Sequence, residues 1–165
     1  MKLKEINECD LDKCFDLFAT FEKDENGFIN DAYGLDKEQF KDFVDIRHGY
    51  SLGQNLPIGY VPCTKYILVD DDENYIGIFG LRHYLNSFLE KGPGHIGYGI
   101  SKKYRGHGYA AVGLKLCLEK AKEKGIETAY LSCYRTNAAS LKTQLKCGAY
   151  IDHEDDKHYY TRIKL

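Results

Sequence analysis

The segment Arg105–Ala110 constrains the fold of this chain more than any other. It connects an apolar run at 95–100 to a segment with helical periodicity. Its sequence is Arg-Gly-His-Gly-Tyr-Ala. Glycine lets backbone N–H groups approach an anion without a Cβ in the way. The first turn of a helix adds unpaired N–H donors and the positive end of the helix dipole. The segment therefore predicts a phosphate-binding turn between a strand and a helix.

Composition points to a single domain over residues 1–165. The chain is 43% hydrophobic and 13% aromatic, which is enough to build a core. Its 23 Lys and Arg residues nearly balance its 25 Asp and Glu residues, so the totals indicate no nucleic-acid partner. No apolar run approaches the roughly twenty residues of a membrane span, and the N-terminus lacks the apolar stretch of a signal peptide. We therefore expect a soluble cytoplasmic protein with no membrane contact.

The six cysteines are spread along the chain and form no C-x2-C pair. In a cytosolic protein such thiols are expected to stay reduced and mostly buried. We therefore predict neither disulfides nor a metal site.

Hydrophobic periodicity and the positions of glycine and proline give the order of the elements. The predicted elements are a strand at 2–6, helices at 11–22 and from 36, strands at 64–70, 74–84 and 95–100, a helix from the glycine turn to Gly125, a strand at 127–134, a helix at 137–146 and two final strands around 154–156. A loop is predicted at 49–62. The order β-α-α-β-β-β-α-β-α-β-β predicts a mixed α/β domain of α+β type, with a sheet that is partly antiparallel and partly parallel.

Three interpretations of the glycine turn compete. A Walker A loop requires Gly-Lys-Ser/Thr after four intervening residues, which the chain lacks. A dinucleotide fingerprint, G-x-G-x-x-A, is present from Gly106 to Ala111, with Glu127 about twenty residues further on. The context of this match does not fit the fingerprint. The acidic residue should stand at the end of the next strand, but Glu127 stands before it, and a polar arm rather than a tight turn from a strand precedes the glycines. A nicotinamide-nucleotide enzyme is therefore the lowest-ranked hypothesis.

The third interpretation rests on a resemblance. Arg105–Ala110 is similar to the R/Q-x-x-G-x-G/A signature of the Gcn5-related N-acetyltransferase (GNAT) family, and the predicted order of elements resembles the fold of that family. The segment 146–149 is similar to the family's K-x-G-F segment. The resemblance covers most of the chain and is strongest over 94–149, the expected cofactor-binding core. It implies a central sheet splayed at the cofactor site and an N-acetyltransferase with acetyl-CoA as co-substrate.

The resemblance also implies which residues contact acetyl-CoA. Backbone amides of the turn would face its pyrophosphate, with positive charge from Arg105 and Lys103. The strand before the turn would pair through its backbone with the pantetheine arm. Asn137 would contact the same arm and also cap its own helix. The expected cofactor contacts are Tyr98, Ile100, Lys103, Arg105, Gly106, His107, Gly108, Tyr109, Ala110, Asn137 and Ser140.

Acetyl transfer to an amine requires a neutral nucleophile, a stabilised oxyanion and a proton for the leaving thiolate. The family often takes that proton from a tyrosine seven residues after the asparagine, where this chain has Gln144. Tyr134 is the expected substitute, and proton transfer from the amine through water is the alternative. His95, near where many relatives place a glutamate, and His83 on the neighbouring strand are the candidate bases. No further ligands accompany them at a zinc-site spacing.

In the family, the first two helices, their connection and the last hairpin shape the acceptor site. In this chain those regions carry acidic residues, which favour a cationic amine. These residues are Asp24, Glu25, Asp31, Asp45, Asp152, Glu154, Asp155 and Asp156. We therefore expect a primary amine on a small molecule or a peptide as acceptor. Relatives are commonly dimers, so a homodimer is a further expectation. A non-catalytic module that holds acetyl-CoA or CoA is the alternative hypothesis, because Gln144 replaces the usual acid.

Overall fold

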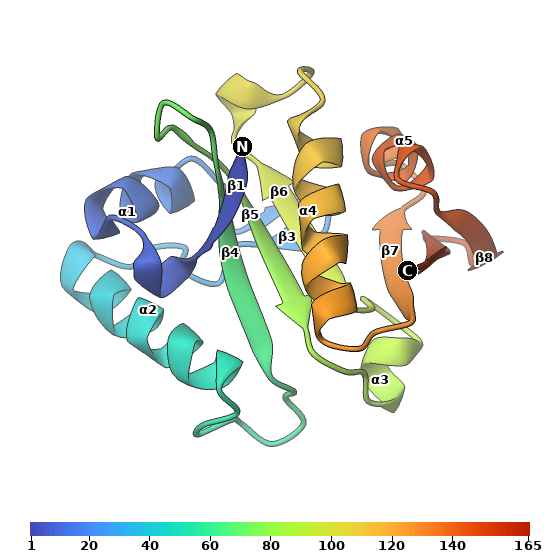
Figure 1. Cartoon of the computed structure of the whole chain (residues 1–165), viewed down its shortest axis with the longest axis horizontal. Coiled ribbons are helices and arrows are strands. Elements are labelled where there is room, and N and C mark those ends of the chain that lie inside the picture. The colour runs from blue at the N-terminus through green and yellow to red at the C-terminus, as the bar shows by residue number, and fades with distance from the viewer.

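The computed structural model describes residues 1–165 as two antiparallel sheets with helices packed around them (Figure 1). The first sheet has the strand order β1-β4-β5-β6 and the second has the order β7-β9-β8. The strands are β1 (Lys2–Glu5), β4 (Cys63–Val69), β5 (Tyr75–Arg82), β6 (Ile96–Ile100), β7 (Thr128–Tyr134), β8 (Tyr150–Glu154) and β9 (His158–Lys164). A separate two-stranded hairpin joins β2 (Asp24–Glu25) to β3 (Phe28–Ile29).

Helices cover both faces of the first sheet. Helices α1 (Leu11–Ala19) and α2 (Lys37–Ser51) lie on one face, and α4 (Tyr109–Glu123) lies on the other. The remaining elements are α3 (Ser87–Glu90), α5 (Ala138–Lys146), which packs against β7, and short 3-10 turns at 6–8 and 102–104. Successive side chains of a strand point to opposite faces, so Ile67 lies in the core beneath α1 and α2, whereas Leu68 lies in the core beneath α4. The fold therefore has two core layers, one on each side of the first sheet.

The predicted mixed α/β domain and its order of elements are confirmed, with differences at the element ends. Helix α1 ends at Ala19 rather than at residue 22, and α2 continues to Ser51, which shortens the predicted loop to 52–62. Helix α3 and the β2–β3 hairpin were not predicted, because α3 is only one turn long and the hairpin has only two residue pairs. Asn26 and Gly27 form the hairpin turn with φ of 53° and 89°, and Asn-Gly is the usual dipeptide of such a turn.

The sheet differs from the predicted mixture of pairings, because every strand ladder is antiparallel. The strands β6 and β7, which α4 connects, meet only at one isolated bridge between Gly94 and Leu131 and then diverge. Gly94 has φ of 69°, and a Cβ on it would overlap the carbonyl oxygen of Tyr130. Only glycine allows the two sheets to touch this closely, so Gly94 fixes the point from which β6 and β7 separate.

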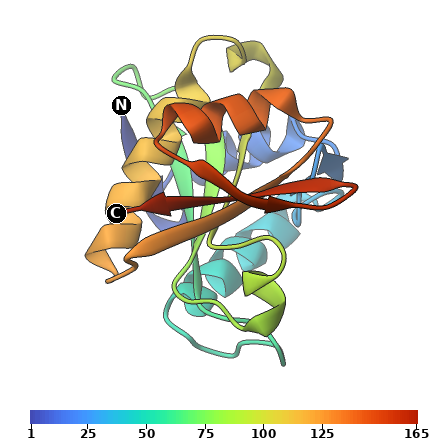
Figure 2. The same cartoon turned by 90° about the vertical axis from the view of Figure 1, so that its right-hand side faces the viewer.

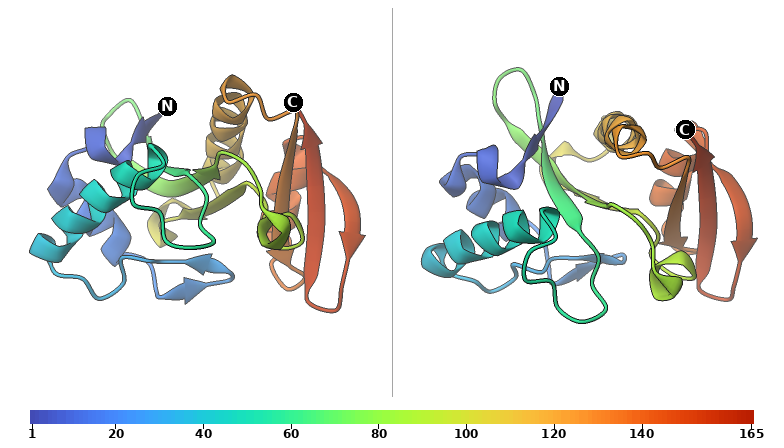
Figure 3. Two further views of the ribbon diagram at one scale, coloured as in Figure 1. Left: turned by 90° about the horizontal axis from the view of Figure 1, so that it is seen from below. Right: turned by 60° about the horizontal axis from the view of Figure 1, so that its bottom comes forward.

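The second sheet stands beside the first, with α5 packed against it and β8 at its free edge (Figure 2). The β2–β3 hairpin extends from the layer of α1 and α2 toward this second sheet, as Figure 3 shows from below. It therefore spans the region where β6 and β7 have separated.

Candidate active site

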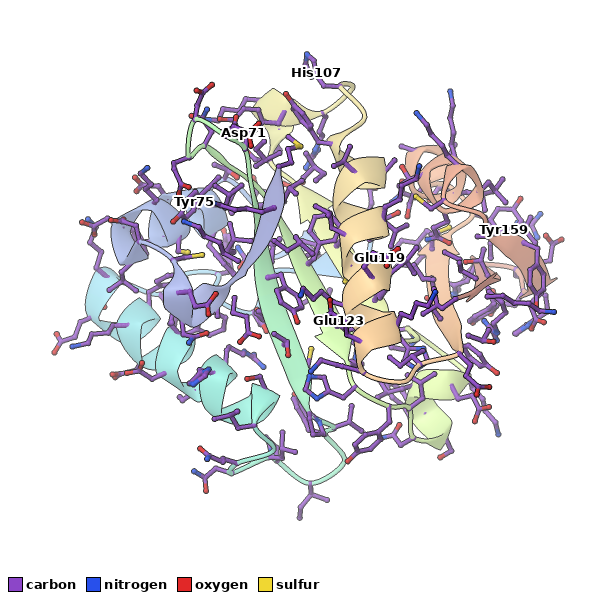
Figure 4. All side chains as sticks on the ribbon, viewed as in Figure 1. Asp71, Tyr75, His107, Glu119, Glu123 and Tyr159 are labelled. Atoms are coloured by element: carbon purple, nitrogen blue, oxygen red, sulfur yellow. The ribbon has the colours of Figure 1, made fainter.

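The turn from Gly106 to Ala110 leaves five consecutive backbone N–H groups, at residues 106–110, without a hydrogen-bond acceptor in the protein. Gly108 is the N-cap of α4 and has φ of 83°. No heavy atom lies within 4 Å of a Cβ built on Gly106 or Gly108, so the turn is open. His107 projects from the tip of the turn (Figure 4), with its Nδ1 2.8 Å from the carbonyl oxygen of Arg105. Together with the dipole of α4, these amides fit a phosphate group.

The free edge of β6 supplies further backbone groups next to the turn. The pairs Arg82–His95 and Ile76–Ser101 are hydrogen-bonded, since Arg82 N donates to His95 O and Ser101 N donates to Ile76 O. In an antiparallel ladder hydrogen-bonded pairs alternate with non-bonded ones, so the N–H and C=O groups of Tyr98 and Ile100 point away from β5. They point toward β7 across the gap between the sheets. This is the orientation that the predicted pairing with a pantetheine arm requires.

Arg105 lies beside the turn but directs its side chain to the β2–β3 hairpin. Its Nε donates to the carbonyl oxygen of Ile100 at 2.8 Å, and its guanidinium forms an ion pair with Glu25. Burial raises the pKa of Glu25, but hydrogen bonds from Arg105 and from the backbone N–H of Glu22 outweigh burial and lower it. Arg105 thus anchors the hairpin to the turn. Lys103, whose Nζ lies over the ring of its neighbour Tyr104, is an exposed cation beside the turn that forms no ion pair.

The tip of the β2–β3 hairpin reaches across the gap between the sheets. The backbone of Gly27 lies against the ring of Tyr134 at the end of β7. The carbonyl oxygen of Asn26 accepts a hydrogen bond of 3.3 Å from Asn137 Nδ2 at the start of α5. The hairpin therefore contacts both sides of the gap, next to two predicted site residues. The sequence predicted that the connection between α1 and α2 helps to shape the acceptor site, but not that it forms a hairpin, although the Asn-Gly dipeptide signals the turn.

Asn137 and Ser140 lie at the N-terminus of α5, as the sequence predicted. Asn137 is the N-cap, and its Oδ1 accepts a hydrogen bond of 3.1 Å from the backbone N–H of Ser140. Ser140 also contacts Tyr98, whose hydroxyl lies 3.1 Å from Ser140 Oγ. Burial raises the pKa of Tyr98 to about 12, and hydrogen bonds from Ser140 and Gln144 offset part of that rise. Tyr98 therefore links β6 to α5 on the α4 side of the gap.

Gln144 is 1% exposed and lies in a buried polar network. Its Nε2 donates to Ser140 Oγ at 3.2 Å, and its Oε1 accepts from Thr161 Oγ1 at 2.7 Å. A buried amide is stable only with such partners, so this network fixes α5 on the second sheet. Gln144 is thus a structural residue here, and its amide is not an acid near neutral pH.

The two candidate bases are each hydrogen-bonded, to different partners. His83 Nε2 lies 2.8 Å from Thr64 Oγ1, and burial lowers the pKa of His83, with a smaller contribution from Lys124. His95 is 7% exposed, and its Nδ1 accepts a hydrogen bond of 3.0 Å from the backbone N–H of Tyr130.

Burial, followed by the nearby charges of Arg82 and Arg162, lowers the pKa of His95 to about 4. The bond to Tyr130 fixes the tautomer of the neutral ring, with the proton on Nε2. Because Nδ1 already accepts this bond, the unprotonated nitrogen that a base needs is occupied. This geometry favours a structural role for His95.

Tyr134 stands at the end of β7 with its ring between two neighbours. One side lies against Gly27, and the ring of His158 stacks on it with the centroids 4.9 Å apart. The Tyr134 hydroxyl makes no hydrogen bond to the protein and is not among the buried polar atoms. The hydroxyl of this predicted acid is therefore held near the gap and free to donate.

The acidic residues expected to attract a cationic acceptor are mostly paired within the protein. Glu25 pairs with Arg105, and Asp31 pairs with Arg47 and Lys65. Further pairs are Glu154 with Arg135, Asp152 with Arg162 and Asp155 with His158. Asp24, Asp45 and Asp156 form no ion pair, and the Asp155 contact is an ion pair only when His158 is protonated. Most of the carboxylates expected to attract a cation therefore have partners within the protein, and three do not.

All six cysteines are free thiols. No group of three or more His, Cys, Asp or Glu side chains is arranged to hold a metal ion. None of the helices has both the length and the apolar character needed to cross a membrane.

Comparison with known proteins identifies the family. A family model described as an acetyltransferase (GNAT) domain matches residues 2–150. No curated protein matches the chain. The N-acetyltransferase PseH of Campylobacter jejuni is similar in structure, with a TM-score of 0.67 and 18% identity over 99% of this chain and 96% of that one. PseH has also been solved in complex with acetyl coenzyme A, and that structure matches with a TM-score of 0.66 and 16% identity over 99% and 97% of the two chains.

A ribosomal-protein-S5-alanine acetyltransferase from Vibrio fischeri matches with a TM-score of 0.64 and 15% identity, over 99% of this chain and 91% of that one. At such identities the structural matches show a shared fold. The family match spans most of the chain and includes the glycine turn with its free amides. The chain therefore belongs to the GNAT family of acyl-CoA-dependent N-acetyltransferases.

Proposed function

We propose that this protein transfers an acetyl group from acetyl-CoA to a primary amine of a small molecule or peptide, by direct attack within a ternary complex. The observation that carries the proposal is the run of five unpaired N–H groups at residues 106–110, next to the free backbone edge of β6. The family match supports acetyl transfer as the reaction. Acetyl-CoA, when bound, supplies a thioester carbonyl that an amine attacks.

The residues of the chain divide this work by position. The amides of residues 106–110 would bind the pyrophosphate, with Lys103 adding positive charge. The backbone groups of Tyr98 and Ile100 would hold the pantetheine arm. The acceptor would bind as the neutral amine, and Tyr134 would donate a proton to the leaving thiolate. His95 and His83 are not needed as bases in this proposal, because the amine loses its proton to water.

A ligand panel tests the proposal. We expect acetyl-CoA and CoA to raise the melting temperature by several degrees and NADP to leave it unchanged, because a ligand that binds only the folded state stabilises it. We expect CoA thiol release when acetyl-CoA is combined with an accepted amine. Stabilisation by acetyl-CoA without turnover on any amine or peptide would favour the non-catalytic binding module instead. Stabilisation by NADP alone would favour the nicotinamide-nucleotide hypothesis.

Tyr134→Phe tests the proposed acid. We expect kcat to fall about tenfold, less than the usual effect of removing an acid, because water can replace part of the proton transfer. The affinity for acetyl-CoA is expected to stay unchanged, since only the hydroxyl is removed. Tyr159→Phe on the adjacent strand β9 is the matched control and should keep the wild-type kcat. An unchanged kcat in Tyr134→Phe, measured by thiol release, would remove Tyr134 from the reaction.

A further inference from the structure

A cluster of cations lies on the face of the first sheet that α1 and α2 cover. On β4, Lys65 lies two residues before Ile67, so the two side chains are on the same face of the sheet. Ile67 belongs to the core beneath those helices. On β5, Arg82 lies four residues after Ile78 of that core, so these two side chains also share that face of the sheet. Arg47 reaches the same place from α2, where it pairs with Asp31 at 2.5 Å. We call Arg47, Lys65 and Arg82 the cation cluster.

The half-buried thiol of Cys63 lies near all three cations. Burial raises the pKa of Cys63, and Lys65, Arg82 and Arg47 all act to lower it. Cys63 pairs directly with Arg82 across β4 and β5. The cluster is thus one arrangement of side chains around Cys63, drawn from α2, β4 and β5.

The cluster has more positive charge than its partners neutralise. Asp31 is paired with both Arg47 and Lys65, the latter at 3.1 Å. Arg82 forms no ion pair, and its hydrogen bond to the carbonyl oxygen of Gly94, at 2.9 Å, uses one of its five donors. The buried Nε of Arg47 has no hydrogen-bond partner. The side chain of Lys65 is 13% exposed and that of Arg47 is 20% exposed, so these are partly desolvated cations with unused donors.

The cluster lies within reach of the strand that the proposed function assigns to the thioester arm. Lys65 pairs with Gly80 across β4 and β5, and Gly80 pairs with Gly97 across β5 and β6. Because Lys65 and Gly97 are two strands apart, their Cα atoms are about 10 Å apart. Arg82 is a diagonal neighbour of Gly97, with its Cα about 7–8 Å away. Gly80 and Gly97 carry no side chains, and no heavy atom lies within 4 Å of a Cβ built on Gly97. Nothing on Gly97 therefore separates its surface from the cations.

We infer that the amine acceptor also carries an oxyanion group, a carboxylate or a phosphate, and that Arg47, Lys65 and Arg82 bind this group while the amine lies near Gly97. The inference rests on the proposed function. Guanidinium groups with free N–H donors bind such planar or tetrahedral oxyanions by charge-assisted hydrogen bonds. It differs from the acidic acceptor site expected from the sequence, where Glu25 and Asp31 are already paired with cations.

Matched acceptors test the inference by activity. One pair is an amino acid and its amide, and the other is glucosamine 6-phosphate and glucosamine, so that each pair differs mainly in the anion. Rates are compared at equal concentrations of unprotonated amine. We expect kcat/KM to be at least about tenfold higher for the anionic member of one pair, and the better pair distinguishes a carboxylate site from a phosphate site. Turnover that is equal within both pairs would overturn the inference and leave the proposed function intact.

Two variants of the cluster are expected to change KM for the anionic acceptor in opposite directions. Arg82→Gln should raise KM for the anionic acceptor about tenfold and leave KM for the neutral acceptor unchanged. Asp31→Asn should lower KM for the anionic acceptor, because it removes the competing carboxylate. Lys41→Gln, which removes an exposed cation on α2 outside the cluster, is the control and should change neither value. Equal effects on both acceptors would indicate a structural role for Arg82.

A binding measurement keeps the inference testable if no acceptor in the panel turns over. With CoA at saturation, inorganic phosphate should raise the melting temperature of the wild-type protein and of Lys41→Gln. It should raise that of Arg82→Gln by less than half as much. An equal shift in all three proteins would overturn the inference. Absence of turnover alone would count against the proposed function and not against the cluster.

Discussion

Gly108→Asp is expected to lower the affinity for acetyl-CoA by about 100-fold or more. The aspartate would place a negative charge among the free N–H groups of residues 106–110, where the pyrophosphate is proposed to bind. Like charges brought together at a binding site cost several kcal/mol, and about 2.7 kcal/mol corresponds to 100-fold. A Cβ at position 108 meets no heavy atom within 4 Å, so the side chain itself fits. Isothermal titration calorimetry with acetyl-CoA measures the loss.

Gly125→Asp is a closely matched control for this variant. Gly125 follows the other end of α4, has φ of 77°, and likewise has no heavy atom within 4 Å of a built Cβ. Both variants therefore introduce the same side chain at a left-handed backbone position, at a cost of about 1–2 kcal/mol of stability. Only Gly108→Asp should lose acetyl-CoA binding. If it binds acetyl-CoA as tightly as Gly125→Asp does, the turn is not the phosphate site.

The features that the sequence predicted correctly are those set by neighbouring residues. The start of α2 near Asp36 and the stop of α4 at Gly125 were predicted, and each depends on a few adjacent positions. The glycine turn is equally local, and its run of free amides follows from the strand–glycine–helix order. Such patterns are visible in any window of about ten residues.

The features that the sequence could not predict depend on contacts between distant segments. Arg105 was expected to face a phosphate, but Glu25, 80 residues earlier in the chain, takes its guanidinium. Asp31 was counted with the acidic acceptor residues, but the fold places it against Arg47 and Lys65. A sequence lists charges and not the distances between them. Which of these carboxylates already have partners could therefore be read only from the structure.

The divergence of β6 and β7 shows the same limit in the backbone. The order strand–helix–strand favours a parallel pair, and a parallel ladder was the expectation. The close approach of Gly94 to Tyr130 instead allows a single bridge before the strands separate. A lone glycine in the sequence Pro-Gly-His has several explanations, including an ordinary turn. Which of them holds is decided by the residue that the glycine meets, 36 positions further on.

The pH dependence of stability is expected to carry a large contribution from His95. Its pKa is about 4 in the folded protein, compared with about 6.5 in the unfolded chain. Between these values the unfolded state binds the proton more readily, so acid favours unfolding. The contribution is fully present above about pH 6.5 and is lost as the pH falls toward 4. From pH 7 to pH 5 we expect this residue to lower the free energy of unfolding by about 2 kcal/mol.

Urea denaturation of the wild type and of His95→Asn at the two pH values measures this contribution. Asparagine Oδ1 can accept the hydrogen bond that Tyr130 N–H gives to His95 Nδ1, but asparagine does not titrate. The variant should therefore lose about 2 kcal/mol less than the wild type between pH 7 and pH 5, because all other groups contribute equally to both proteins. His95→Ala removes the bond as well, so it should be less stable at both pH values and show the same reduced slope. If the wild type and His95→Asn lose equal stability, the His95 ring is not held neutral by burial, and a role for it as a base near neutral pH is open again.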